Sequence, residues 1–445
     1  MSQADRPRPA GADALSGAGP GGPQPGGPQP GGAASSATAV PAGVPLGRNR
    51  GFRLLWIGQI LSDTGSEVGF LAYPLLILAL TGSPVLAGTV GTARSVALFV
   101  LRLPAGALAD RLDRRLTMIV CDVVRALLLA LLGLLVLLHA AAWPVVGVVS
   151  LLDGGANAIF DPAAMAALPA IVPDGQLEQA FAATEARQFT ASLVGPALGG
   201  LLFGLARAVP FLADAASYAV SFGTVSRIRG RFRPEHAERK RLWAEVVDGL
   251  RLVWQVPLLR AVVVQSPLIN FGFSGVIFAV ILALREHGTR AAVIGVVLAG
   301  VSAGGVAGAV VAARLQRRLP LSALIVVVTF GAAVLFAAAA LLVPSPLVAL
   351  PVAASFLLTP AANAALFAQM QRRTPEHMRG RVNNTVIMVA SGLASLAPLL
   401  AGLLVQQVSG HWAVGCFAAV MVVAALLSVL LPGIRNAESA AGTDA

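Results

Sequence analysis

The octapeptide "ADRLDRRL", Ala109 to Leu116, places five ionisable side chains in eight consecutive residues. The chain of 445 residues is otherwise 56% hydrophobic and only 12% charged, whereas soluble domains carry roughly 25% charged residues. A near copy, "AARLQRRL", begins 203 residues later at Ala312 (312 − 109). Both copies lie between long apolar segments. The stretch therefore predicts a short charged turn between two membrane-spanning helices, and its repetition predicts two related halves.

The chain contains twelve apolar segments separated by loops, and each has the length of about 20 residues that a bilayer-spanning helix needs. The expected spans are 52–80, 84–108, 116–139, 143–168, 176–206, 209–227, 258–284, 290–313, 320–342, 346–371, 380–407 and 411–432. This pattern predicts an all-α integral membrane protein.

The basic residues, which give a net charge of +11, gather in every second loop and are almost all arginines. By the positive-inside rule both chain ends and the central loop are cytoplasmic. Two loops depart from the pattern, since "PDGQLEQ" at 173–179 lacks arginine and the loop at 284–290 contains two. We interpret the charge as topology next to an anionic membrane surface, and expect no nucleic-acid partner.

Further matches between the halves support a duplication. "PAAMAAL" from Pro162 recurs as "PAANAAL" from Pro360, and "GPALGGLL" from Gly195 recurs as "APLLAGLL" from Ala397, at offsets of 198 (360 − 162) and 202 (397 − 195). Because six is an even number, both copies have the same orientation in the membrane. The sequence predicts two parallel six-helix bundles, an architecture that rocks about a midplane site.

The segments outside the bundles differ in composition. Residues 1–46 include "GPGGPQPGGPQPGG" and are expected to form a disordered cytoplasmic tail. We expect an N-terminal bundle at 47–226, a cytoplasmic linker at 227–257, a C-terminal bundle at 258–432 and a short tail at 433–445. The linker has Leu242, Val246, Leu250 and Val253 at helical spacing, which predicts an amphipathic helix on the membrane surface. We interpret it as a connection between the halves rather than as a regulatory dock.

The octapeptide is part of a longer pattern, G-x-x-x-D-R-x-x-R-[RK], which is matched at Gly106, Asp110, Arg111, Arg114 and Arg115. With this pattern, residues from about 47 to 432 resemble a transporter of the major facilitator superfamily. In that family the turn acts as a conformational latch that pairs with a helix end of the other half.

The second copy of the turn has Ala313 where the first has Asp110, so only the first turn is expected to keep the full latch. Asp122 and Arg125, close to the cytoplasmic end of the third segment, are expected to support it.

A more specific resemblance concerns the fifth segment, where "GPALGG" is similar to the G-P-x-x-G-G core of the family's antiporter motif. Its matching residues are Gly195, Pro196, Gly199 and Gly200. Packing of small residues alone is the alternative explanation. With "LWIGQILSDTG", "CDVVRALL" and "FDPAAMAALPAIVP", the chain resembles the siderophore and macrolide exporters.

This second resemblance implies alternating-access export of a drug-, macrolide- or siderophore-like amphipathic molecule in exchange for protons. The R-x-x-x-G-x-G motif of many proton-driven antiporters is missing, so their proton relay is not carried over. A nutrient importer and a non-transporting sensor or scaffold are the alternatives.

Ionisable residues within membrane helices cost at least ~2.5 kcal/mol each and are functional candidates. The candidates for proton coupling or substrate binding are Asp63, Glu67, Arg94, Asp153, Asn157, Glu185, Arg187 and Gln188. One carboxylate among Asp63, Glu67, Asp153 and Glu185 is expected to carry the proton. The alternative is a set of static ion pairs, such as Asp63 with Arg94. The C-terminal half is nearly free of such charges and is expected to supply apolar substrate surface.

Other function classes lack support in the sequence. The phosphate-binding pattern G-x-x-x-x-G-K-[ST] does not occur, and we expect neither an enzyme nor a primary pump. No metal or cofactor is expected, because the two cysteines lie in apolar segments. The expected partners are the lipid bilayer, a small-molecule substrate and protons, and the expected form is a monomer in a bacterial inner membrane.

Overall fold

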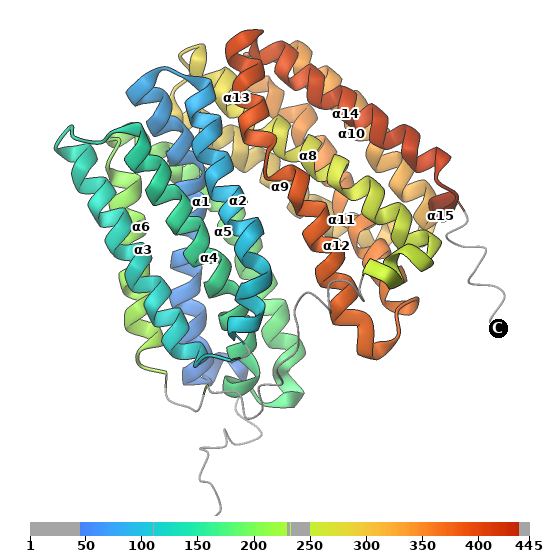
Figure 1. The fold of residues 1–445 in the computed structure, drawn as a ribbon, viewed down its shortest axis with the longest axis horizontal. Helices are drawn as coiled ribbons and strands as arrows, with labels where there is room; N and C mark the ends of the chain where they lie inside the picture. The colour runs from blue at the N-terminus through green and yellow to red at the C-terminus, as the bar shows by residue number, and fades with distance from the viewer. Residues whose placement is uncertain (1–44, 110, 229–231, 233–249, 436–445) are drawn as a thin grey trace, which may run out of the picture. The chain divides into compact units, whose positions relative to one another are not determined.

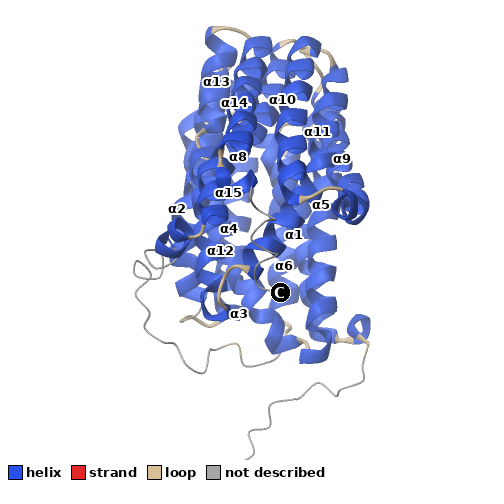
Figure 2. Ribbon diagram, turned by 90° about the vertical axis from the view of Figure 1, so that its right-hand side faces the viewer, coloured by secondary structure: helices blue, strands red, loops and turns tan. Residues whose placement is uncertain are grey.

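The computed structural model describes residues 45–109, 111–228, 232 and 250–435 (Figure 1). Every regular element in this part of the chain is helical, and Figure 2 shows no strand among them. The predicted all-α membrane fold is confirmed. The predicted tails lie mostly outside the described residues, as does the linker, of which residues 250–255 are helical.

Each of the twelve predicted segments corresponds to a helix or a broken helix. In the N-terminal half these are α1 (Arg50–Thr81), α2 (Pro84–Ala109), α3 (Arg114–Leu137), α4 (Trp143–Ile171), α5 (Leu177–Leu205) and α6 (Val209–Val225). In the C-terminal half they are α8 (Pro257–Glu286), α9 (Ala291–Arg318), α10 (Leu321–Leu342), α11 (Ala349–Arg372), α12 (Arg379–Ala394), α13 (Ala397–Gln407) and α14 (Gly410–Leu430). The short α15 (Pro432–Arg435) follows.

Eleven spans in the described ranges are long and apolar enough to cross a membrane, with α12 and α13 counted together. The twelfth segment, α6, has 17 residues.

The helices pack mainly within two sets, α1–α6 and α8–α14, and the pairings repeat. The contact of α2 with α4 corresponds to that of α9 with α11, and the contact of α3 with α6 corresponds to that of α10 with α14. The same neighbours in both sets confirm the predicted parallel repeat of a six-helix bundle.

The two copies of the charged octapeptide fold differently, which corrects the expectation of two equivalent turns. In the first copy Asp113 caps α3, because its Oδ1 accepts a hydrogen bond of 3.0 Å from the Leu116 amide. The equivalent residue in the second copy is Gln316, which lies inside α9 and donates from Nε2 to the Ala361 carbonyl at 3.0 Å. Without a capping carboxylate, α9 continues to Arg318.

The eleventh predicted segment is also not one continuous helix, since α12 ends at Ala394 and α13 begins at Ala397. Pro398 at the start of α13 has no amide hydrogen to continue the helix. The next amide, that of Leu399, donates a 2.9 Å hydrogen bond to Thr92 Oγ1 of α2. The break therefore places a polar contact between the two halves.

Two seams join the halves, one between α2 and α13 and one between α5 and α9. A Cβ atom added at Gly88 would lie 2.4 Å from the Pro398 carbonyl oxygen, and one added at Gly402 would lie 2.4 Å from that of Pro84. The α5–α9 seam repeats this arrangement through Gly200 and Gly295, which approach the carbonyls of Ala291 and Pro196 at the same 2.4 Å. Only glycine permits such close backbone contact.

All four glycines lie near the same end of the helices, the end that carries the α1–α2, α5–α6, α8–α9 and α13–α14 links. We call it the sealed end. There Gln406 Oε1 also accepts hydrogen bonds from Ser83 Oγ at 2.8 Å and from the Val85 amide at 3.1 Å.

Substitution of Gly295 by valine should weaken the α5–α9 seam, because the new side chain meets the Pro196 carbonyl. Overpacking of this kind costs about 1–3 kcal/mol, which shifts a near-balanced equilibrium towards conformers whose sealed end is open. Spin labels at Gly204→Cys and Glu286→Cys should report longer distances. Gly300→Val is the matched control on α9, since a Cβ there meets no atom within 4 Å. An equal increase of the spin-label distance in both variants would contradict the role of the α5–α9 seam in closing the sealed end.

Candidate functional site

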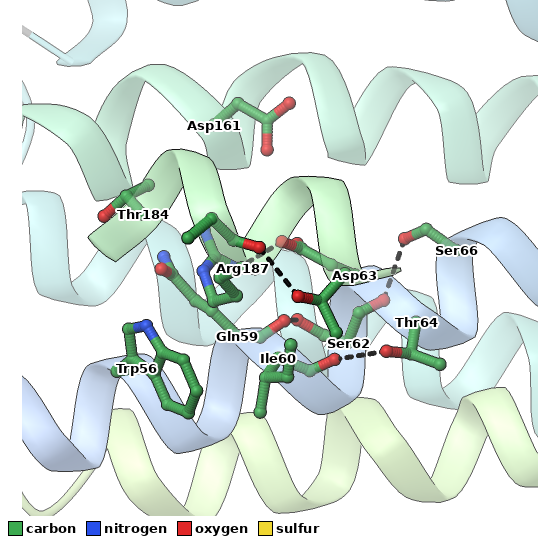
Figure 3. A network of polar contacts seen from close by, with 12 residues as sticks. Trp56, Gln59, Ile60, Ser62, Asp63, Thr64, Ser66, Asp161, Thr184 and Arg187 are labelled. Carbon is green, nitrogen blue, oxygen red and sulfur yellow. Dashed lines mark hydrogen bonds and ion pairs between the residues drawn. The ribbon is translucent and has the colours of Figure 1, made fainter. Parts of the chain in front are cut away.

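A partly buried ion pair links α1 and α5 in the N-terminal bundle. Arg187 NH1 donates to Asp63 Oδ2, and the arginine side chain is only 4% exposed. Its Nε is buried without a hydrogen-bond partner among the described residues. Asp161, on the neighbouring α4, directs its carboxylate towards this pair (Figure 3). Arg187 is therefore paired with Asp63 alone, while the carboxylate of Asp161 faces this pair and interacts with Arg187 only electrostatically.

A second polar cluster surrounds Arg125 of α3, whose side chain is 2% exposed. Its Nε donates to Asp153 Oδ1 at 2.8 Å, NH1 to Asn157 Oδ1 at 2.9 Å and NH2 to Ser66 Oγ at 3.2 Å. The guanidinium also lies over the ring of Tyr218, 4.1 Å from its centroid. We call this cluster the arginine hub, and it connects α1, α3, α4 and α6.

Arg94 adds α2 to the hub, because its Nε donates to Asp153 Oδ2 at 3.3 Å. Asp153 thus accepts from two arginines, which leaves the hub with one excess positive charge. Glu67 interacts electrostatically with Arg94 and offsets this charge. The buried Asp214 of α6 also interacts electrostatically with Arg125 and Arg94, so carboxylates offset both arginines of the hub. Around Arg187, the carboxylates of Asp63 and Asp161 face a single guanidinium.

Two expectations from the sequence are corrected here. The suggested pair of Asp63 with Arg94 is wrong, because α1 presents Asp63 to α5 while α2 packs against α4 and Asp153. Arg125 lies in the hub, not at the turn that it was expected to support.

Asp122, the other residue expected to support the turn, is fully buried beside Ser221 of α6. Neither its carboxylate oxygens nor the Ser221 hydroxyl has a normal hydrogen bond to any described residue.

The residues of the predicted latch lie in different surroundings. Asp110 lies outside the described residues, Gly106 has open space around it and Arg111 is exposed. Arg114 NH1 donates to the Ala166 carbonyl of α4 at 2.7 Å, and Arg115 donates to the carbonyls of Val225 and Ser226 at the end of α6. These two arginines thus hold the start of α3 within its own bundle, and a latch to the other half stays a prediction.

A pocket of about 370 Å³ opens beside the Asp63–Arg187 pair. It is lined by Asp63, Ser66, Glu67, Asn157, Asp161, Glu185, Gln188, Phe189, Ala191 and Ser192. Five predicted site residues are therefore brought together, with Arg187 bound at the edge and Arg94 and Asp153 behind in the hub.

The sequence interpretation did not name Asp161, Ser66, Phe189 or Ser192 as candidates. The sequence does show Asp161 in a polar stripe with Asp153 and Asn157, at i, i+4 and i+8 on one helix face, although Asp161 was left out of the candidates.

The antiporter-like motif forms part of the wall and part of a seam. A Cβ added at Gly195 would lie 2.3 Å from the Glu67 Cβ, and one at Gly199 would lie 3.0 Å from the Val68 carbonyl oxygen. Gly195 and Gly199 thus let α5 approach α1, while Pro196 and Gly200 lie in the α5–α9 seam.

The pocket is strongly acidic. Four of its lining side chains are carboxylates and none is basic, with Arg187 paired to one of them. Among the described residues, no group of three His, Cys, Asp or Glu side chains is arranged to hold a metal ion. The excess negative charge can be neutralised by a proton or by an organic cation, and the ring of Phe189 supplies apolar surface for the latter.

Two parallel-repeat bundles with a polar pocket in one of them define a membrane transporter of the major facilitator type. The chain belongs to the transmembrane secretion effector family of this superfamily, whose model matches residues 42–443. The family resemblance stated from the sequence is confirmed, and this is a family of transporters, not of enzymes.

Named relatives and solved structures agree with this assignment. The chain is 29% identical over 404 residues to the multidrug efflux pump Tap of Mycolicibacterium fortuitum, covering 87% of this chain and 97% of the relative. It is 25% identical over 362 residues to the enterobactin exporter EntS of Citrobacter koseri, covering 79% and 85%. A crystal structure of the nucleoside transporter NupG has the same fold, with a TM-score of 0.69 at 12% identity and coverage of 86% and 98%.

Proposed function

We propose that this transporter exports amphipathic small molecules from the cytoplasm in exchange for protons, and that it prefers cationic ones. The observation that carries the proposal is the excess negative charge of the pocket, in which Asp63 is paired with Arg187 while Asp161 has no ion pair with a described residue. The names of the relatives, an efflux pump and an exporter, support the direction.

Exchange follows from competition for one unbalanced negative charge. A proton bound to Asp63 or Asp161 leaves the pair with Arg187 neutral, so that a cationic substrate is no longer attracted. A bound cation makes protonation less favourable to the same extent, because coupling between two ligands is reciprocal. One carboxylate pair therefore suffices to make the two ligands alternate.

The direction of access follows from the predicted topology. If the basic loops are cytoplasmic, the sealed end faces outward, and the present conformer admits substrate from the cytoplasm. Opening of both seams would expose the pocket to the outside, where the substrate leaves and a proton enters. We further propose that the protein acts as a monomer in a bacterial inner membrane with both termini cytoplasmic, and that Gly106, Asp110 and Arg111 latch the closed cytoplasmic side.

The two alternative functions, a sensor or scaffold and an importer, would require different properties of the pocket. A sensor or scaffold would not need an acidic pocket of 370 Å³. A proton-driven importer of the same fold would have to bind its substrate and the proton together, whereas competition for one negative charge favours exchange.

Transport of a lipophilic cation tests the proposal. In inverted vesicles with an acidic lumen, the wild type should accumulate tetraphenylphosphonium, and collapse of the pH gradient should release it. In purified protein, tetraphenylphosphonium should bind at least about ten-fold more tightly than tetraphenylborate, an anion of the same shape. Equal affinities would refute the cation preference, and accumulation that ignores the gradient would refute proton exchange.

A further inference from the structure

Two turns occupy equivalent positions in the two halves, with the same order of secondary structure and opposite net charges. "PDGQLEQ" begins at Pro173 and "PEHMRGR" at Pro375, an offset of 202 (375 − 173). Each proline is followed by one turn of 3-10 helix, η2 (Asp174–Gln176) or η4 (Glu376–Met378), and then by a membrane helix, α5 or α12. The duplication therefore places the two turns at the same depth, at the end opposite the sealed end.

The first turn is acidic. Asp174 and Glu178 are both exposed, and no basic residue occurs between positions 173 and 186. Of the two loops that depart from the positive-inside pattern, this is the one that lacks arginine. Since Asp and Glu contribute little to orientation, topology alone gives no reason for acids at this place. We call residues Asp174–Glu178 the acidic turn.

The second turn borders a pocket of about 370 Å³ lined by Gln371, Arg372, Arg379, Gly380 and Asn383. Both arginines are exposed. Arg379 is held at the rim by a 3.3 Å hydrogen bond from Nε to the Gln371 carbonyl and by an exposed 3.4 Å pair with Glu376. We call this set the basic pocket.

The helix contacts predict which parts of the two turns face each other. Helix α5 packs against α9, and α9 packs mainly against α11 within its own half. The start of α5 therefore lies on the same side of the molecule as the C-terminal end of α11. In the same way, α13 packs against α2, and α2 packs mainly against α4. The start of α12, which precedes α13, therefore lies on the same side as the C-terminal end of α4. Rotation of the halves that opens the sealed end brings these opposite ends together.

We propose that the acidic turn seats in the basic pocket when the cytoplasmic side closes, with Asp174 against Arg379 and Glu178 against Arg372. This gate rests on the alternating access proposed above. Exposed ion pairs are individually weak, which suits contacts that form and break in every cycle. The gate also gives a reason for the one arginine-free loop on this side of the membrane.

Cross-linking in proteoliposomes tests the gate. The inner reporter is Gly175→Cys with Gly380→Cys, in a chain whose Cys121 and Cys416 are replaced by alanine; a Cβ at either glycine meets no atom within 4 Å. The outer reporter is Ser83→Cys with Gln406→Cys, which are in contact in this conformer. The two cross-links, formed with a short bifunctional maleimide, should vary in opposite directions.

Charge reversal then separates the gate from a general effect of charge. Arg379→Glu should lower inner cross-linking about five-fold, and the addition of Asp174→Arg should restore it. Arg435→Glu, which removes an exposed arginine of α15 from the same side, should leave it unchanged.

Failure of the swap to restore cross-linking would overturn the proposal. The proposal would also be overturned if Arg379→Glu lowered inner cross-linking only in vesicles of phosphatidylglycerol and not in vesicles of phosphatidylcholine. The pocket would then bind a lipid headgroup. If the swap restores cross-linking but the wild type moves no tetraphenylphosphonium, the gate stands and the proposed function fails.

Discussion

Substitution of Arg125 by methionine should remove most of the folded transporter from the membrane. Methionine keeps much of the volume but leaves Asp153, Asn157 and Ser66 without the donor that joins them. Removal of one partner from a buried ion pair typically costs about 3–5 kcal/mol, because the other charge stays buried. The midpoint of thermal unfolding in detergent and the yield of monodisperse protein should both fall.

Two further variants separate the lost charge from the lost geometry. Arg125→Lys keeps the charge but cannot reach three partners at once, and should be intermediate in stability. Arg227→Met is the matched control, since this arginine is exposed and, among the described residues, its side chain donates only to the Gly223 carbonyl of α6. If Arg125→Met were as stable as Arg227→Met, the hub would not be the structural centre of the bundle.

Asp161→Asn should abolish exchange while leaving the fold intact. Asp161 forms no ion pair with a described residue, and its one hydrogen bond, from Asn157 Nδ2, is long at 3.5 Å. The amide removes the excess negative charge and leaves Arg187 paired with Asp63. Binding of tetraphenylphosphonium should weaken at least about five-fold, and proton-driven accumulation should disappear.

Asp63→Asn provides the contrast, because it deprives the buried Arg187 of its partner. We expect it to lower stability as well as transport, with Asp161 accepting the guanidinium in part. Glu286→Gln, at the exposed end of α8, should change neither property. Retention of gradient-driven accumulation by Asp161→Asn would assign the coupling to another carboxylate.

The fold was largely predictable because its signals are local and repeated. Apolar runs of bilayer length predict the helices, and recurrence of the Ala109–Leu116 octapeptide predicts the duplication. The fate of the second copy was missed, although its cause is visible in the sequence. Asp113 can cap a helix and Gln316 cannot, so that only the first copy interrupts the helix.

The pairing within the site was less predictable. Depth in the membrane can be estimated from position along a helix, and by this measure Asp63 and Arg94 lie at comparable depths. Which residues meet depends on how each helix is rotated about its axis, and that is set by contacts such as those of Gly195 and Gly199 with α1. Five of the eight candidate residues line one pocket and the other three lie beside or behind it, while their partners could be assigned only from the structure.

Proton release on substrate binding tests the central claim most directly. Purified wild-type protein in weakly buffered detergent solution is titrated with tetraphenylphosphonium while the pH is recorded. If a cation and a proton compete for the Asp63–Asp161 pair, then at a starting pH low enough for the pair to hold a proton about one proton should be released per bound cation, and Asp161→Asn should release almost none. Binding of the cation without any release of protons would contradict the account.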